Sequence, residues 1–133
     1  MKSLDEQYQD ALIVSELISI RGALIKMKRH LERVKIALPN PTYDEYTKLG
    51  AIRQCLICLT RPYSELGWSV QETVREYQNK IEEYITSLSP EYTLHPAEAL
   101  IALTGNGSIQ RVIDYINRLD DVVCSTMREF QNE

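Results

Sequence analysis

Apolar residues recur along most of this chain at steps of three and four residues, a spacing that places them on one side of an α-helix. The most regular run is in the N-terminal third, where the steps alternate as in a heptad repeat. This run consists of Leu17, Ile20, Leu24, Met27, Leu31, Val34 and Leu38. A less regular continuation upstream consists of Leu4, Tyr8, Ala11 and Val14. Ser3 and Glu6 form a capping box and Pro39 stops the pattern, so the sequence predicts a long helix over about residues 4–38.

Similar signals predict three more long helices and one short one. Capping boxes that begin at Thr42 and Ser69 open helices that run to about Leu59 and Leu88. Pro96 suits the first position of a short helix that runs to Thr104. Residues 105–107 read Gly-Asn-Gly, a strong helix stop, and Ser108 is the predicted cap of a last helix through Phe130. The segment from Tyr63 to Trp68 is predicted to be a loop.

These elements predict an all-α fold in a single domain over residues 1–133, an antiparallel bundle of four main helices and one short helix. Short connections should make successive helices antiparallel neighbours. Hydrophobic residues are 44% and charged residues 26% of the chain, which is enough to build a core. The fold therefore needs no disulfide or structural metal.

The first predicted helix is longer than any other in the chain. It would span roughly 50 Å, against roughly 25–33 Å for the other main helices. Either it bends near Gly22, or part of its apolar side is left for another chain. Its first half is acidic, through Asp5, Glu6, Asp10 and Glu16, and its second half is basic. Two antiparallel copies would match these charges, so we predict self-association as a homodimer or higher oligomer.

Two groups of side chains are candidate partner-binding residues. The basic residues between positions 21 and 35 are Arg21, Lys26, Lys28, Arg29, Arg33 and Lys35. Aromatic residues predicted around the ends of the second helix are Tyr43, Tyr46, Tyr63 and Trp68. The basic row suits an acidic protein partner, or the phosphates of a nucleic acid, or it is a solvated helix face. The aromatic residues are equally suited to closing the ends of a bundle.

No residue pattern predicts a catalytic, cofactor or metal site. Cys55 and Cys58 form a CxxC pair, but it lies near the C-terminal end of a helix, where the dipole does not favour a thiolate. Zinc would need two more ligands in place, and Cys124, His30 and His95 are isolated from the pair in the sequence. We therefore expect buried thiols, no cofactor and no enzyme activity.

The sequence lacks a long apolar run and an N-terminal signal segment, so we expect a cytoplasmic protein that does not contact membranes. The function we expect is a small protein–protein interaction module, such as an adaptor, inhibitor or assembly factor, that acts through helical faces. The alternative is a helical bundle that associates with nucleic acid through the basic face of residues 21–35. The net charge of −4 disfavours a general nucleic-acid coat.

Overall fold

The computed structural model describes residues 1–131, and these form an all-helical bundle without strands. The predicted fold class is confirmed: four main helices, one short helix and a long helix at the N-terminus. The helices are α1 (Leu4–Ala37), α2 (Glu45–Thr60), α3 (Trp68–Leu88), α4 (Pro96–Gly105) and α5 (Ile109–Gln131), with a 3-10 helix, η1 (Pro90–Thr93), between α3 and α4.

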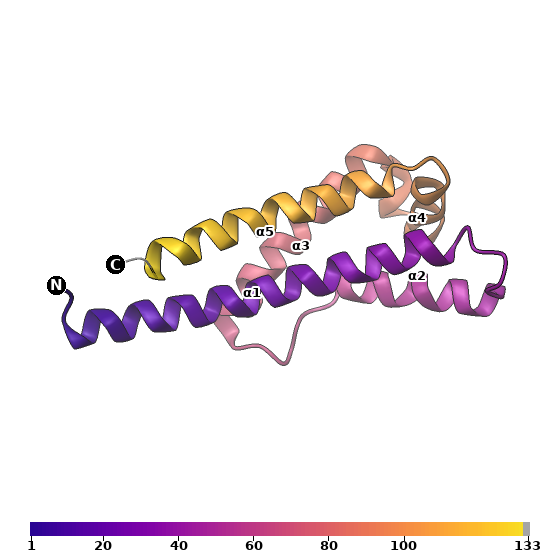
Figure 1. Ribbon diagram of the computed structural model, residues 1–133. Helices are drawn as coiled ribbons and strands as arrows, with labels where there is room; N and C mark the ends of the chain where they lie inside the picture. Colours follow the sequence, from indigo (N-terminus) through magenta and orange to yellow (C-terminus); the bar gives the residue numbers. More distant parts are fainter. Residues whose placement is uncertain (132–133) are drawn as a thin grey trace.

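The predicted boundaries of α1 are also confirmed. The Ser3 hydroxyl oxygen accepts a hydrogen bond from the backbone N–H of Glu6 at 3.1 Å, as expected for the N-cap of this helix. The helix ends at Ala37, before Pro39. It is continuous through Gly22, so the predicted length is not divided into two separate helices (Figure 1).

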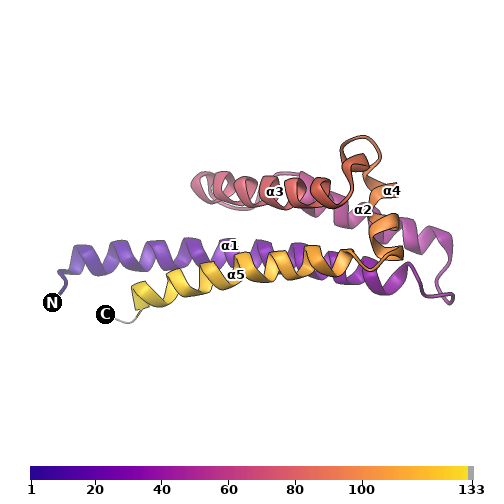
Figure 2. The same cartoon turned by 90° about the horizontal axis from the view of Figure 1, so that it is seen from above.

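The main pairing in the bundle joins the two ends of the chain. α1 and α5 run side by side and antiparallel, and both termini lie at the same end of the molecule (Figures 1 and 2). α2 packs against α1 at the other end of the bundle, and α3 also contacts α1. α1 and α2, which follow each other in the sequence, therefore pack together as expected. The helix that α1 contacts most extensively, however, is α5.

The core lies along the second half of α1, where α2, α3 and α5 contact this helix. The regular apolar run contributes the fully buried side chains of Leu24, Met27, Leu31 and Val34. Leu17 and Leu38, at the two ends of that run, are half-buried. Apolar residues of α2, α3, α4 and α5 complete this cluster, which includes Leu59, Ile81, Leu100 and Ile116.

The start of α2 differs from the predicted capping box. Its N-cap is Asp44, whose carboxylate accepts the backbone N–H of Thr47 at 2.7 Å. This hydrogen bond lowers the pKa of Asp44. Thr42 instead donates both its N–H and its hydroxyl to the side-chain oxygen of Asn40. The prediction was wrong because the two possible caps lie two residues apart, and Thr42 is used by the preceding turn.

The start of α3 also differs, and it moves Trp68 from the predicted loop into the helix. The N-cap is Gly67, and Trp68 is the first helical residue. Ser69, the predicted cap, is already inside the helix and its hydroxyl donates to the carboxylate of Glu16 on α1 at 3.4 Å. This tertiary contact was not visible in the local sequence.

A buried glutamine joins α3 to the end of α2. The side chain of Gln78 is fully buried, and its amide donates to the carbonyl oxygens of Cys58 and Arg61, each at 2.9 Å. These carbonyls belong to the last turn and C-cap of α2, where a helix has no acceptor partners of its own. Gln78 therefore completes the C-terminal end of α2 from a neighbouring helix.

Candidate interaction surface

The two halves of α1 differ in what they contact. Residues 4–19 are all exposed or half-buried, whereas every buried residue of α1 lies between Ile20 and Ala37. Large apolar side chains are nevertheless present in the first half. The exposed ones are Leu4, Tyr8, Leu12, Ile13 and Ile18. Several large apolar side chains exposed along one helix segment are typical of a contact with another macromolecule.

The side of α1 that faces away from the core carries a regular series of positions, here called the outer stripe. It follows alternating steps of four and three residues from one end of the helix to the other. Its members are Leu4, Tyr8, Ala11, Ser15, Ile18, Gly22, Ile25, Arg29, Glu32 and Ile36. All ten are exposed or half-buried. α1 therefore has two helical seams, one that builds the core and one that faces solvent.

Charge divides α1 into the same two halves. Residues 4–20 contain four acidic and no basic residues, whereas residues 21–36 contain six basic residues and one acidic residue. The pairing of opposite charges inside the chain is incomplete. Asp10 is paired with Lys2, and Arg21 donates to Asp120 of α5 at 3.2 Å.

The structure separates the predicted basic residues into two groups. Arg21, Lys26 and Lys35 have partners within the bundle: Lys35 donates to Gln110 at 2.5 Å, and the Lys26 ammonium lies 5.5 Å from the centroid of the Tyr63 ring. Lys28, Arg29 and Arg33 form no hydrogen bond or ion pair with another side chain of residues 1–131. The second group is the part of the basic row that a partner could use.

A groove of about 630 Å³ lies between α1 and α2, beside the second half of the outer stripe. Its walls include Arg29, Glu32, Arg33 and Ile36 from α1, Tyr43 from the connection that precedes α2, and Thr47, Gly50 and Gln54 from α2. The structure thus brings together three predicted site residues, Arg29, Arg33 and Tyr43. The sequence analysis did not identify Ile36 and Gly50 as site residues. Ile36 is an apolar residue among charged ones, and Gly50 is a glycine inside a helix, so both differ from their neighbours in the sequence.

The other predicted aromatic residues do not join this groove. Tyr46 is exposed in the first turn of α2, and Trp68 is exposed at the start of α3. These two helix starts are well separated in Figure 1. Tyr63 is only 7% exposed and belongs to the core. The four aromatic residues therefore do not form one surface.

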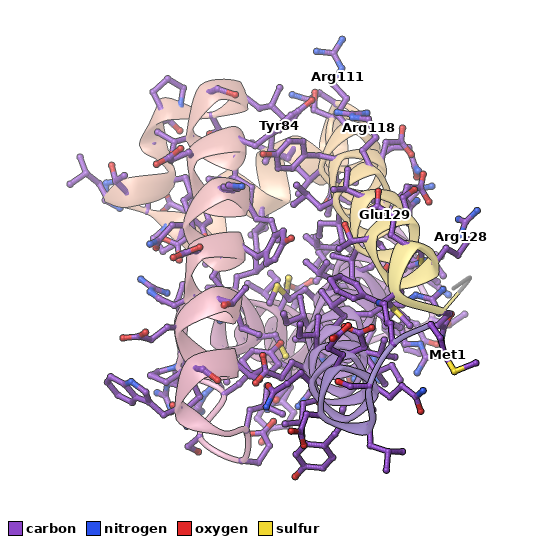
Figure 3. All side chains as sticks on the ribbon, turned by 90° about the vertical axis from the view of Figure 1, so that its left-hand side faces the viewer. Met1, Tyr84, Arg111, Arg118, Arg128 and Glu129 are labelled. Atoms are coloured by element: carbon purple, nitrogen blue, oxygen red, sulfur yellow. The ribbon has the colours of Figure 1, made fainter. Side chains whose placement is uncertain are left out.

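Three arginines of α5 were not singled out by the sequence analysis. Figure 3 shows Arg111, Arg118 and Arg128 on α5, with the acidic Glu129 beside them. The guanidinium of Arg118 is 5.6 Å from the centroid of the Tyr115 ring. Tyr115 in turn stacks on Tyr84 of α3, with the ring centroids 4.5 Å apart. The separation of Arg111 and Arg118 by seven residues was the available signal.

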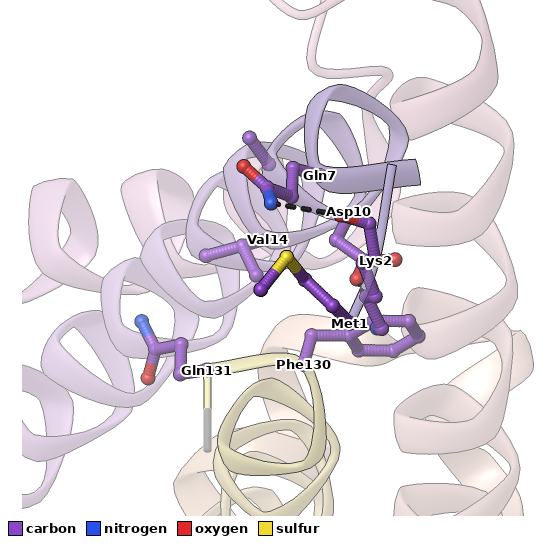
Figure 4. Close-up of a pocket in the computed structure, with 8 residues that line it drawn as sticks. Met1, Lys2, Gln7, Asp10, Val14, Phe130 and Gln131 are labelled. Carbon is purple, nitrogen blue, oxygen red and sulfur yellow. Dashed lines mark hydrogen bonds and ion pairs between the residues drawn. The ribbon is translucent and has the colours of Figure 1, made fainter. Parts of the chain in front are cut away.

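A cavity of about 720 Å³ lies between the beginning of α1 and the end of α5 (Figure 4). It is lined by apolar groups such as Val14 and Phe130, with Gln7 donating to the carbonyl of Lys2 at 3.1 Å. Among the lining residues within 1–131, Asp10 carries the one side-chain carboxylate, and it is paired with Lys2.

Burial disfavours the charged forms of Cys55, Cys58 and His30. Burial raises the pKa of Cys55 to about 12, and burial also raises the pKa of Cys58. Both thiols are therefore protonated at neutral pH and are poor nucleophiles. Burial, together with the charges of Arg33 and Lys26, lowers the pKa of His30. Within residues 1–131, no group of three or more His, Cys, Asp or Glu side chains is placed to hold a metal ion.

Comparison of the chain with protein-family models, with curated proteins and with solved structures gives no match. None of the helices described in residues 1–131 has the length and apolar character needed to cross a membrane. The fold and its surface define a helical bundle that presents a long solvent-facing helical seam beside a basic groove.

Proposed function

We propose that this chain is a non-enzymatic protein–protein interaction module, an adaptor, inhibitor or assembly factor, that acts through helical faces and associates with itself. The observation that carries the proposal is the outer stripe. It presents Leu4, Tyr8, Ile18 and Ile36 to solvent on a helix that already uses its opposite side for the core. Amphipathic helices and apolar grooves recognise each other by such spaced side chains.

The groove between α1 and α2 supports an acidic partner segment. Arg29 and Arg33 line it without an ion-pair partner among residues 1–131, and Ile36 and Tyr43 add apolar and aromatic contact area. Arginine and aromatic side chains contribute strongly to protein interfaces. Arginines at the edge of the contact would also make association faster at low salt.

The alternative, association with nucleic acid, has support from Lys28, Arg29 and Arg33 but uses only half of the predicted basic row. The other three basic residues are engaged with Asp120, Gln110 and Tyr63. Three adjacent cations provide few phosphate contacts, and the chain as a whole is acidic. We therefore rank the protein-binding proposal first.

The test is a pull-down with the tagged full-length chain from cells that express it, with half of each sample treated with nuclease before mass spectrometry. Two variants make the comparison specific: Ile36→Ser on the outer stripe, and Val122→Ser on α5 as a control, since these side chains are 64% and 62% exposed. We expect proteins that survive nuclease, are lost with Ile36→Ser and are retained with Val122→Ser. Recovery that disappears with nuclease, with nucleic acid in the untreated half, would replace the proposal by the nucleic-acid alternative.

A further inference from the structure

We propose that two copies of this chain pair antiparallel through the outer stripe of α1, so that the first half of each α1 lies along the α1–α2 groove of the other copy. This inference rests on the proposed function, because it identifies a second copy as one protein that the module binds. It adds the surface, the direction and the register of the contact.

The spacing of the outer stripe is the same when read from either end. If a second copy runs in the opposite direction, Leu4 lies opposite Ile36 and Ile18 lies opposite Gly22. Each of the other positions of the outer stripe then also lies opposite a position of the stripe. A twofold axis between residues 18 and 22 would therefore superimpose the two stripes. Most homodimers have this symmetry, in which the same surface patch is used by both copies.

The sizes of the paired side chains are complementary in this register. Ile18 meets Gly22, Ile25 meets Ser15, and Arg29 meets Ala11, so a large side chain is opposite a small one at three successive levels. Leu4 and Ile36 form an apolar pair at each end. Facing positions that alternate large and small side chains are what close helix packing requires.

Gly22 gives independent support, because nothing among residues 1–131 requires a glycine there. It lies in the middle of a continuous helix, where glycine is less stable than alanine. A Cβ added at this position would meet no atom of the described residues within 4 Å. An isoleucine from a second helix at this level supplies a reason for the missing side chain.

Charge selects the antiparallel direction. In this arrangement, the acidic residues 4–20 of one copy lie beside the basic residues 21–36 of the other. A parallel pair would place acidic beside acidic and basic beside basic, which disfavours that alternative. Arg29 and Arg33 have no ion-pair partner within residues 1–131, so they are available for the contact.

The groove is placed to receive the first half of the second α1. In the proposed register, Tyr8 of the second copy is level with Glu32, beside Arg29 and Arg33 of the groove. A Cβ at Gly50, on the α2 wall, would meet no described atom within 4 Å, so the wall is open at that point. A tyrosine ring beside two arginines allows cation–π contact in addition to apolar burial.

The first experiment measures dimerisation of the full chain by sedimentation equilibrium over a range of concentrations. We expect a monomer–dimer equilibrium that Ile18→Ser weakens by about tenfold to a hundredfold, because the dimer buries this side chain. Val122→Ser, at an apolar position on α5 that is 62% exposed against 54% for Ile18, should leave the dimer unchanged. Gly22→Ala should weaken the dimer about tenfold while it stabilises the monomer, a combination that a purely structural role of Gly22 would not produce.

The second experiment tests direction and register by disulfide formation in a Cys124→Ser background, which removes the partly exposed native thiol. One chain carries Leu4→Cys and the other carries Ile36→Cys. A disulfide needs Cα atoms within about 7 Å, so we expect a mixed dimer to form on oxidation and neither chain alone to cross-link.

The outcomes separate this inference from the proposed function. A dimer that is insensitive to Ile18→Ser, or that cross-links Leu4→Cys to itself, overturns the antiparallel stripe and leaves the interaction module standing. A chain that stays monomeric at high concentration overturns the inference and the self-association, while nuclease-resistant capture of another protein would still support the module. A chain that binds neither itself nor another protein would contradict both.

Discussion

The two halves of α1 are continuous in one helix but lie in different surroundings. In the second half, Leu24, Met27 and Leu31 are enclosed by α2, α3 and α5. In the first half, Leu4 and Tyr8 are exposed, and α5 is the helix that accompanies α1 to this end of the molecule (Figures 1 and 2). The apolar spacing is helical in both halves, so periodicity alone does not decide which residues are buried.

The difference has a simple geometric cause. α1 has 34 residues, whereas α2 has 16 and α3 has 21, so neither can extend along all of α1. The apolar residues that extend beyond them cannot be covered by those helices. Exposed apolar residues in the first half of α1 are better explained by a contact with another molecule than by a contribution to the stability of this fold.

The largest effect that would distinguish the two halves is a cavity in the core. Leu31→Ala should lower the free energy of unfolding by about 2–5 kcal/mol, because Leu31 is fully buried and its surroundings can only partly close the space. Leu12→Ala, at a residue that is 43% exposed in the first half, should change it by less than about 0.5 kcal/mol. Urea unfolding of both variants at low protein concentration measures the difference. Equal losses would show that the first half is buried as deeply as the second.

A smaller effect should follow from removing the polar link between α2 and α3. Gln78→Leu should cost about 1–3 kcal/mol, because the carbonyls of Cys58 and Arg61 lose the side-chain amide that satisfies them. Asn79→Leu is a matched control at the next, exposed position of α3. Urea unfolding again provides the measurement, and a Gln78 variant as stable as the Asn79 variant would contradict this role.

The fold could be predicted from the sequence because helix signals are local and repeated. The steps of Ile20, Leu24, Met27, Leu31 and Val34 indicated both the helix and its buried side, and the structure buries all five. The helix caps were less predictable because several polar residues near each helix start can serve as the N-cap. Thr42 and Ser69 both fit a cap, but contacts with Asn40 and Glu16 determine their actual use.

The candidate site could be predicted only in part. The sequence indicated a basic row and exposed apolar length on α1, but not that α5 would pair with α1 or that α2 would form a groove beside Arg29 and Arg33. Tyr43 and Tyr63 show the same limit. Both are aromatic residues near a helix end, yet Tyr43 lines the groove and Tyr63 is in the core. Such differences arise from tertiary packing, which leaves no local signal.

The smallest predicted effect is a pH dependence of the stability, and it arises from His30 in the second half of α1. His30 is half-buried, its Nδ1 atom has no hydrogen-bond partner among residues 1–131, and burial together with Arg33 and Lys26 lowers its pKa below the usual 6.5. As the pH falls below about 6.5, the unfolded chain binds a proton at this position before the folded chain does. Stability should therefore decrease from pH 7.5 toward pH 5.5, and the loss is complete below the folded pKa.

A His30→Gln variant isolates this effect from the other titrating groups. Burial raises the pKa of Glu82, which has the opposite sign because the folded chain then binds a proton more readily than the unfolded chain. Glu82 is present in both proteins, so its contribution cancels when the melting temperatures of wild type and variant are compared at each pH. The wild type should lose more stability than His30→Gln between pH 7.5 and 5.5, by less than either of the stability losses above. A constant difference between the two proteins across this range would show that His30 titrates equally in the folded and unfolded chain, and that the packed half of α1 does not penalise its charge.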